Sequence, residues 1–164
     1  MSTSLMMMRK NETETAWTRN RSVVEKSALV LNWCVRRGLS VDRIKGEGVQ
    51  VHIYAKLPPS ENCPVSVSVP ITVRAFYDCR PDIVQIGSAD HQFSIESLDD
   101  LEKALKKGTA AFAKLTQAKL SSLCQGEGND DEQREFQSWK KTATGRLALS
   151  RQLDSVRQSN RSRS

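Results

Sequence analysis

The sequence has few of the residues that usually disclose an enzyme. Only 5% of its 164 residues are aromatic, and two are histidines. It contains no Gly-x-Gly-x-x-Gly, P-loop or Gly-x-Ser-x-Gly motif, the familiar signatures of nucleotide binding and of serine hydrolases. His52 occupies a polar position of a predicted strand and His91 lies in a predicted loop, so both are expected to be solvated side chains. We therefore predict no catalytic residue, no cofactor and no metal site, and a protein that is not an enzyme.

The cysteines and the apolar runs exclude further classes of protein. The four cysteines are widely spaced and form no Cys-x-x-Cys pair, a pattern typical of neither a disulfide scaffold nor a zinc knuckle. The apolar stretch at residues 5–8 is too short for a signal-peptide core, and no run approaches the roughly 20 apolar residues of a membrane span. We expect a cytoplasmic or nuclear protein, neither secreted nor transmembrane.

Positive charge is the main feature that the composition does contain. Lys and Arg number 25 against 19 Asp and Glu, a net charge of +6. An excess of this size favours acidic partners such as RNA or DNA, and it is also compatible with solubility alone. Apolar residues make up 38% of the chain, enough for one modest core. The predicted organisation is a disordered arm at 1–21, a compact domain at 22–124, a linker at 125–131, an amphipathic basic helical segment at 132–156 and a disordered tail at 157–164.

Residues 22–37 are predicted to form the first helix. Ser22 and Glu25 have the spacing of a capping box at its start. Gly38 stands where a helix commonly ends in a left-handed residue, and Leu39 after it is expected to fold back onto the last turn. Apolar residues at helical spacing predict the buried stripe, which consists of Val24, Ala28, Leu31 and Val35, widened by Val30 and Cys34.

Period-two alternation is the clearest signal in the sequence. Apolar and polar residues alternate over 49–57 and again over 65–77, which predicts two strands with one buried face each. Within the second strand, the residues predicted to face the core are Val67, Val69, Ile71 and Val73. Pro70 has no N–H donor, so this strand is predicted to be an edge strand or to be bulged there. Shorter strands are predicted at 83–86 and 92–95.

A second helix is predicted to begin at Ser97, a suitable cap, with Asp99 and Asp100 in its first turn. Its apolar stripe consists of Leu98, Leu101, Leu105, Phe112 and Leu115. Gly108 falls on this stripe, where it is predicted either to break the helix or to let another backbone approach closely. The fold class is therefore α+β: an antiparallel β-meander of three or four strands packed against helices, in the order α-β-β-β-(β)-α.

The order helix, three strands, helix is similar to the layout of double-stranded-RNA-binding domains, and the similarity is one of element order alone. Such domains carry a Lys-Lys-x-x-Lys-like cluster at the start of the closing helix, where it meets phosphates. In this chain the corresponding start is the acidic sequence Ser97-Leu98-Asp99-Asp100.

Repeated positive charge favours association with nucleic acid as the first function class. Lys103, Lys107 and Lys114 are predicted to share the solvent side of the second helix, where lysines at helical spacing are able to track phosphates. A solvated lysine face is the plain alternative for any single helix. The candidate phosphate-binding residues are Arg36, Arg37, Lys103, Lys106, Lys107, Lys114, Lys140, Lys141, Arg146 and Arg151.

The alternative class is a protein–protein adaptor or assembly subunit. Phe136, Trp139 and Leu147 have helical spacing in the segment after the linker, and they are the candidate partner-binding residues. The same apolar stripe also suits packing on the chain's own domain. An exposed sheet edge is a second possible contact, for a homodimer. Association with a membrane surface would need a stronger apolar face than this segment has, so a membrane partner is not expected.

Overall fold

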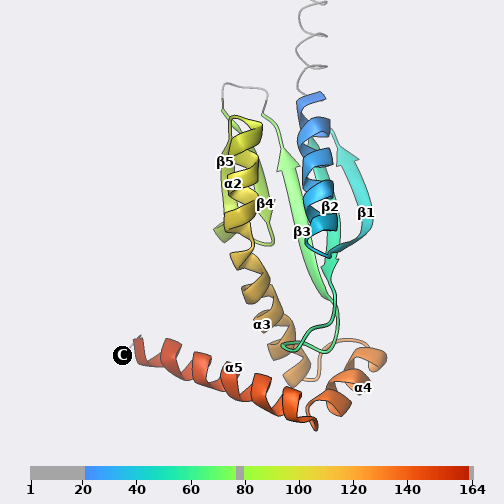
Figure 1. Ribbon diagram of the computed structural model, residues 1–164, viewed down its shortest axis with the longest axis vertical. Coiled ribbons are helices and arrows are strands. Elements are labelled where there is room, and N and C mark those ends of the chain that lie inside the picture. The colour runs from blue at the N-terminus through green and yellow to red at the C-terminus, as the bar shows by residue number, and fades with distance from the viewer. Residues whose placement is uncertain (1–20, 77–79, 163–164) are drawn as a thin grey trace, which may run out of the picture.

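The computed structural model describes residues 21–76 and 80–162, and of residues 155–162 the backbone alone (Figure 1). An N-terminal helix (residues 21–36) is followed by five strands and by four further helices. The strands are β1 Ser40–Glu47, β2 Gln50–Leu57, β3 Val67–Arg74, β4 Asp82–Ile86 and β5 Gln92–Ile95, with the short 3-10 helix η1 Ala89–His91 before β5. The helices are α2 Leu98–Gly108, α3 Ala110–Cys124, α4 Asp130–Trp139 and α5 Ala143–Ser162. The arm predicted over 1–21 lies outside the described residues except for Arg21, which is helical.

The five strands form one antiparallel sheet in the order β1-β2-β3-β4-β5, which confirms the predicted α+β meander. The prediction of three or four strands omitted β1. This strand carries only two large apolar residues, Val41 and Ile44, and a register shift between Val41 and Arg43 interrupts the alternation. It is also almost wholly exposed at the sheet edge, so burial imposes no period-two pattern on it. Five strands instead of three precede α2, so the resemblance in element order to double-stranded-RNA-binding domains is not kept.

The prediction that β3 is an edge strand or is bulged at Pro70 is wrong, because β3 is the central strand and its pairing with β2 passes through Pro70 without a register shift. Its ladder with β4 runs from Arg74 to Ile71 and ends one residue before Pro70. The Pro70 carbonyl accepts a hydrogen bond from the Gly87 N–H at 2.8 Å. In an antiparallel strand the nitrogen and the carbonyl of one residue point to the same side, so the Pro70 nitrogen, which has no hydrogen to donate, also points toward the β4 side, past the end of the β3–β4 ladder. A proline is tolerated there since no hydrogen bond of the sheet requires its N–H.

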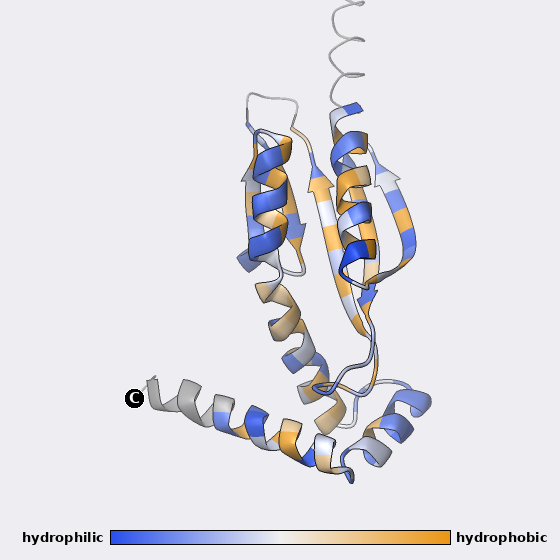
Figure 2. Ribbon diagram, in the orientation of Figure 1, coloured by the Kyte–Doolittle hydropathy of each residue, from blue (hydrophilic) through white to orange (hydrophobic). Residues whose placement is uncertain are grey.

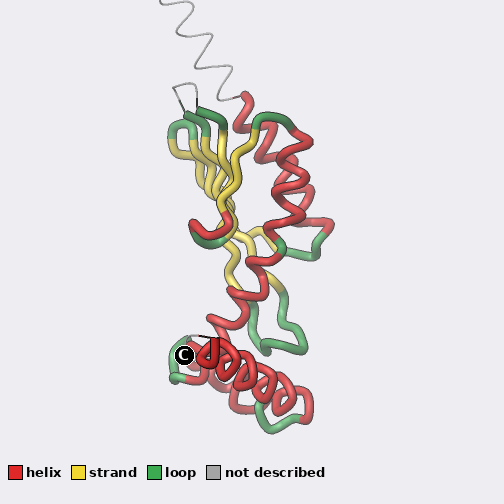
Figure 3. The backbone as a smooth tube through the Cα atoms, turned by 90° about the vertical axis from the view of Figure 1, so that its left-hand side faces the viewer, coloured by secondary structure: helices red, strands yellow, loops and turns green. Residues whose placement is uncertain are grey.

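The N-terminal helix, α2 and α3 lie on one side of the sheet (Figure 3), and they bury the apolar face of the strands. Apolar and polar residues alternate along β3 (Figure 2), as predicted. Val67, Val69, Ile71 and Val73 face the core, each at most 4% exposed. We term the main set of buried residues the body cluster; its sheet members include Ile53, Ile71, Val84 and Ile95, and its helix members include Val30, Cys34, Leu101 and Leu105.

The N-terminal helix buries a stripe that shares Val30 and Cys34 with the predicted one but leaves out Val24 and Val35. Val24 and Val35 are 63% and 72% exposed, whereas Val23, Lys26, Ser27, Val30, Trp33 and Cys34 are buried. The buried stripe contains two polar residues, and each has a partner. Lys26 Nζ forms an ion pair with Asp82 Oδ2 of β4, and the Ser27 hydroxyl donates to the Val23 carbonyl at 2.7 Å.

Of the two predictions for the ends of the N-terminal helix, the one for its start is wrong and the one for its end is confirmed. Ser22 lies inside the helix, where its hydroxyl accepts a hydrogen bond from Lys26 Nζ at 3.1 Å, so the predicted capping box is not formed. At the other end, Gly38 has a φ of 75°, and Leu39 N donates to the Cys34 carbonyl at 2.9 Å. The predicted left-handed helix ending is therefore confirmed.

The predicted second helix is divided into α2 and α3 at Thr109. Ser97 caps α2, because its hydroxyl accepts from the Asp100 N–H at 3.2 Å, as predicted. Gly108 is buried against β4, and a Cβ at this position would lie only 2.1 Å from Ile86 Cδ1. The helix is interrupted after Gly108, as the first alternative expected, but the group that approaches this glycine closely is the Ile86 side chain and not a backbone.

A smaller set of buried residues, the foot cluster, packs α3 and α4 together at one end of the sheet, with Leu149 of α5 against it (Figure 1). It consists of Cys63, Val65, Val67, Leu120, Leu123 and Phe136. Asn129 and Glu132 form a complete capping box, so α4 begins at Asp130, inside the predicted linker. The helix of α5 extends to Ser162, through most of the tail predicted to be disordered. Among the described residues, no helix is both long and apolar enough to cross a membrane.

Candidate nucleic-acid interface

Two of the three helices that cover the sheet, the N-terminal helix and α2, border a groove with several positive charges. This helix groove lies between the N-terminal helix and α2, has a volume of about 480 Å³ and includes Leu29, Trp33 and Leu105 in its apolar wall. Four of the predicted phosphate-binding residues line it, namely Arg36, Arg37, Lys103 and Lys106. Asp99 and Glu102 line it as well. The four cations therefore outnumber the carboxylates in this groove.

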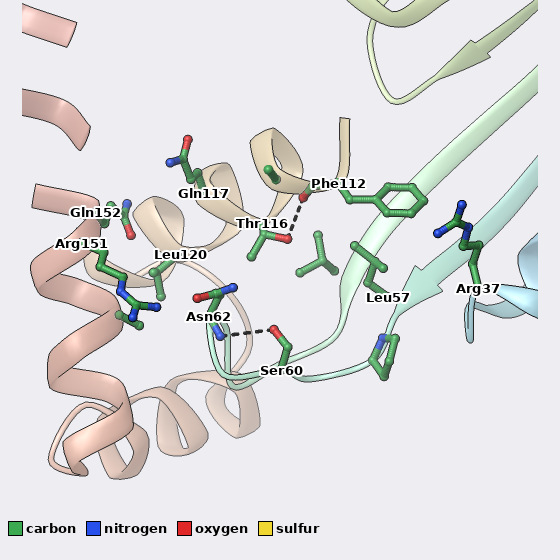
Figure 4. Close-up of a pocket in the computed structure, with 14 residues that line it drawn as sticks. Arg37, Leu57, Ser60, Asn62, Phe112, Thr116, Gln117, Leu120, Arg151 and Gln152 are labelled. Atoms are coloured by element: carbon green, nitrogen blue, oxygen red, sulfur yellow. Dashed lines mark hydrogen bonds between the residues drawn. The ribbon is translucent and has the colours of Figure 1, made fainter. Parts of the chain in front are cut away.

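A second cavity, the arginine cleft, lies between the β2–β3 loop, α3 and α5 and has a volume of about 500 Å³. Figure 4 shows Arg37 at one end and Arg151 at the other. Leu57, Phe112 and Leu120 supply apolar parts of the wall. No carboxylate is among the described residues that line it. The positive charge of this cleft is therefore not neutralised from within its own wall.

Neutral polar side chains occupy the wall between the two arginines. They are Ser60 and Asn62 from the loop, Thr116 and Gln117 from α3, and Gln152 from α5 (Figure 4). The Asn62 N–H donates to Ser60 Oγ at 3.3 Å, and Gln152 Nε2 donates to Ser121 Oγ at 2.7 Å. Gln152 Oε1 is buried without a hydrogen-bond partner among the described residues. The wall thus offers hydrogen-bonding groups without charge.

Shared residues join these cavities into one path. Arg37 lines both the arginine cleft and the helix groove, and Lys103 lines both the helix groove and a third hollow beside β5. The path therefore gathers six of the ten predicted cations: Lys107, Lys103, Lys106, Arg36, Arg37 and Arg151. Glu96 and Asp100 line the third hollow, so carboxylates offset the path's charge least at the arginine cleft.

The structure does not bring the other four predicted cations to this path. Lys114 is exposed on α3, and the break at Thr109 separates it from the part of α2 that carries Lys103 and Lys107. The remaining three lie at the turn between α4 and α5 and at the start of α5; they are Lys140, Lys141 and Arg146.

The three candidate partner-binding residues have different environments. Phe136 is 3% exposed and belongs to the foot cluster. Trp139 is half-buried, with its ring centre 6.2 Å from that of Phe136. Leu147 is 54% exposed on α5, so it alone of the three presents most of its surface to a partner.

The uncovered face of the sheet carries basic and aromatic residues that were not among the candidates. We term it the open sheet face; it includes Arg43, Lys45, His52, Tyr54, Lys56, Thr72, Arg74 and Gln85. The Arg43 guanidinium lies 4.2 Å from the centre of the Tyr54 ring, and Lys56 Nζ lies 3.0 Å from Asp42 Oδ2. The alternation of these residues with buried apolar ones is the signal that could have found them. Asn62 and Gln152 were missed as well, and no local pattern distinguishes them from other surface amides.

The buried thiols show no sign of nucleophilic chemistry. Desolvation by burial raises the pKa of the Cys34 thiol to about 11 and raises the pKa of Cys63 above its ordinary value. Both therefore remain protonated, and a protonated thiol is a poor nucleophile. Within the described ranges, no group of histidine, cysteine, aspartate and glutamate side chains is arranged to hold a metal ion.

Comparisons with protein-family models, with curated proteins and with solved structures found no match to this chain. The function is therefore argued from the chain's own geometry.

Proposed function

We propose that the protein is a small, non-enzymatic basic protein that associates with nucleic acid through Lys and Arg contacts to phosphates. The observation that supports the proposal is the path of cavities that Arg37 and Lys103 join. Cations from the N-terminal helix, α2 and α5 border this path, although these elements are far apart in the sequence. A row of cations along adjoining hollows is suited to a polyanion, which offers one phosphate after another.

The arginine cleft is the part of the path where phosphate contacts should be strongest. Guanidinium groups bind phosphate through two parallel N–H donors, and their charge here is not offset by a carboxylate in the same wall. Lys103 has carboxylates in both hollows that it lines, which weakens its attraction for a phosphate, whereas Arg37 meets them only in the helix groove and not in the arginine cleft. The proposal therefore gives Arg37 and Arg151 the leading role.

The test is the salt dependence of binding. Binding of the intact chain to single-stranded and duplex oligonucleotides is measured by fluorescence anisotropy between about 0.05 and 0.2 M salt, where phosphate contacts change affinity most visibly. Replacing both Arg37 and Arg151 by Gln should reduce the slope of log affinity against log salt by about 1.4–1.8, at roughly 0.7–0.9 per phosphate contact.

The control is the double change Arg21→Gln with Arg134→Gln, which alters the net charge equally. Both of these residues are exposed and form ion pairs outside the path, with Glu25 and Asp131. The control should leave the slope unchanged. Equal slopes for the two double variants would show that net charge, and not the path, governs binding. Absence of binding at the lowest salt would overturn the proposal.

An adaptor is the second candidate, and the exposed apolar residues of α5 favour it. Leu147 and Leu153 are 54% and 60% exposed, although Ala148 beside Leu147 is buried. Replacing Leu147 and Leu153 by Asn should abolish a protein complex if α5 binds a partner, and it should leave nucleic-acid affinity unchanged. Sedimentation of the intact chain, alone and with a candidate partner, measures whether this complex forms.

A further inference from the structure

The arginine cleft contains groups that phosphate binding alone does not require. Three amide side chains, Asn62, Gln117 and Gln152, line it together with its two arginines and the ring of Phe112 (Figure 4). An amide side chain donates and accepts from adjacent atoms, as the edge of a nucleobase does. Aromatic rings and guanidinium planes are the usual stacking surfaces for unpaired bases. The lining therefore resembles a site for a base more than a site for phosphate only.

The size and enclosure of the cleft fit a single nucleotide. Its volume of about 500 Å³ lies within the roughly 300–1,000 Å³ of small-ligand sites. Its walls come from three elements, the β2–β3 loop, α3 and α5, so a ligand is contacted from several sides. A base within a duplex is paired and stacked, so an enzyme or binding protein reaches its edge in such a cleft only when the nucleotide is unpaired.

The loop that presents Asn62 is fixed before any ligand arrives. Ser60 and Cys63 pair across it, with Ser60 N donating to the Cys63 carbonyl at 2.9 Å and Cys63 N donating to the Ser60 carbonyl at 3.3 Å. The Cys63 side chain is 1% exposed and anchors the loop in the foot cluster. A pre-ordered loop loses little entropy when it binds, which favours affinity.

Gln152 is oriented in the same way and has an acceptor without a donor. Its Nε2 donates to Ser121 Oγ at 2.7 Å, which holds the amide in place. Its Oε1 is buried and lacks a hydrogen-bond partner among the described residues. A buried acceptor left without a donor costs free energy, and a shift of the Gln152 side chain that exposes Oε1 to the cleft would let the exocyclic amine of a base supply the missing donor.

We propose that the arginine cleft binds one unpaired nucleotide of a single-stranded RNA or DNA. Asn62 and Gln152 contact the edge of the base, and Arg37 and Arg151 contact phosphates of the strand on either side of it. This inference rests on the proposed function and adds a requirement: the strand must be unpaired at the cleft.

The experiment compares a single-stranded oligonucleotide with the duplex made from it, on the full chain. The double change Asn62→Ala with Gln152→Ala should weaken single-strand binding by roughly tenfold, the usual range for lost base-edge contacts. It should leave duplex binding and the salt slope unchanged, because no phosphate contact is removed. Gln137→Ala, an exposed amide on α4 outside the cleft, is the control and should change nothing.

Each result separates this inference from the function on which it rests. If the chain binds single strand and duplex equally well, and the amide double variant behaves like the wild type, the inference fails and the phosphate-binding function stands. If neither nucleic acid binds, both fail.

Because Gln152→Ala also removes the hydrogen bond to Ser121, the single variant Asn62→Ala is measured too. It changes an exposed loop residue and should show at least part of the weaker binding to single strands. A free nucleoside monophosphate that competes as well as the oligonucleotide would show a small-molecule site instead.

Discussion

The body cluster and the foot cluster are built in different ways. The body cluster packs side chains onto a sheet whose five strands are joined by backbone hydrogen bonds, each strand to its neighbour along the chain. The foot cluster has fewer buried residues and joins one loop, one strand end and the helices α3 and α4, with the ion pair Lys119–Glu132 and the hydrogen bond from Gln133 Nε2 to the Leu123 carbonyl beside it. Regions with fewer buried contacts open at lower free energy than the core of a sheet. We therefore expect the foot to open before the body.

This difference matters for function because the arginine cleft lies where the two clusters meet. Leu57, which lines the cleft, packs against both clusters, and so does Leu115. Arg37 follows the N-terminal helix of the body, whereas Arg151 and Gln152 belong to α5 beside the foot. Opening of the foot would therefore separate the two arginines, and stability of the foot would govern how well the cleft is pre-formed.

The largest expected effect is the loss of the buried ion pair in the body. Lys26→Met leaves the Asp82 carboxylate without its cation, at a position where the two side chains are only 10% and 17% exposed. Breaking such a pair from one side costs about 3–5 kcal/mol. Chemical denaturation measures the loss of the free energy of unfolding.

Two further variants identify the cause of that loss. The double variant Lys26→Met with Asp82→Leu should recover much of the loss, since it leaves no unpaired buried charge. Lys45→Met changes an exposed lysine of β1 and should be nearly neutral. A double variant as unstable as the single one would mean that packing, and not charge, explains the effect.

The second effect tests the two faces of β3 against each other. Ile71 is fully buried in the body cluster, so Ile71→Ala should cost about 2–5 kcal/mol through lost burial and the cavity left behind. Ser68 lies on the same strand with its side chain exposed on the open sheet face, so Ser68→Ala should be nearly neutral. The free energies of unfolding of the two variants are compared directly, and similar losses would mean that both faces of β3 are packed.

Local signals in the sequence predicted those parts of the fold that depend on neighbouring residues. The alternation in β2 and β3, the glycine ending at Gly38 and the cap at Ser97 each require only a few adjacent positions, and all were confirmed. The buried face of the N-terminal helix could not be found in this way. Its polar residue Lys26 is buried because of Asp82, 56 residues away in the sequence.

The same limit applies to the candidate site. Charge alone indicated Arg37 and Arg151, but only the packing of α5 beside α3 places them on one cleft. Nothing near Asn62 or Gln152 in the sequence marks them, since surface amides are common and their role depends on which cavity they line. The edge strand β1 was missed for a related reason: it is exposed on nearly all sides, so burial leaves no pattern in its sequence.

The third effect concerns the junction of α2 with the sheet. In Gly108→Ala the new methyl group would lie 2.1 Å from Ile86 Cδ1, so the strand or the side chain must shift, at a cost of about 1–3 kcal/mol. Gly46→Ala is the control, because no atom lies within 4 Å of the position its Cβ would take. Thermal and chemical denaturation give the difference. In an Ile86→Val background the cost of Gly108→Ala should shrink, and an unchanged cost would point to the helix break instead of the contact.

The smallest effect distinguishes the two clusters by the rates at which their cysteines react. Cys34 is buried in the body and Cys63 in the foot, at 0% and 1% exposure. Burial raises the pKa of Cys34 from 9.0 to about 11 and raises that of Cys63 as well. A folded state that holds the thiol proton more tightly is favoured below pH 9.0, and this contribution is lost as the pH rises toward about 11.

Labelling with a thiol reagent, followed by mass spectrometry of each cysteine peptide, should therefore proceed through opened states. Cys63 should react faster than Cys34 because the foot opens first. Phe136→Leu, which weakens the foot by about 1 kcal/mol, should speed labelling of Cys63 roughly fivefold and leave the labelling rate of Cys34 unchanged.

The labelling rate should rise with pH and level off near 9.0, the ordinary thiol pKa, since the reacting thiol is exposed in the opened state. A rate that continues to rise toward pH 11 would indicate attack on the closed protein. Equal acceleration of both cysteines would show that the body and the foot open as one unit, and the arginine cleft would then be as stable as the sheet itself.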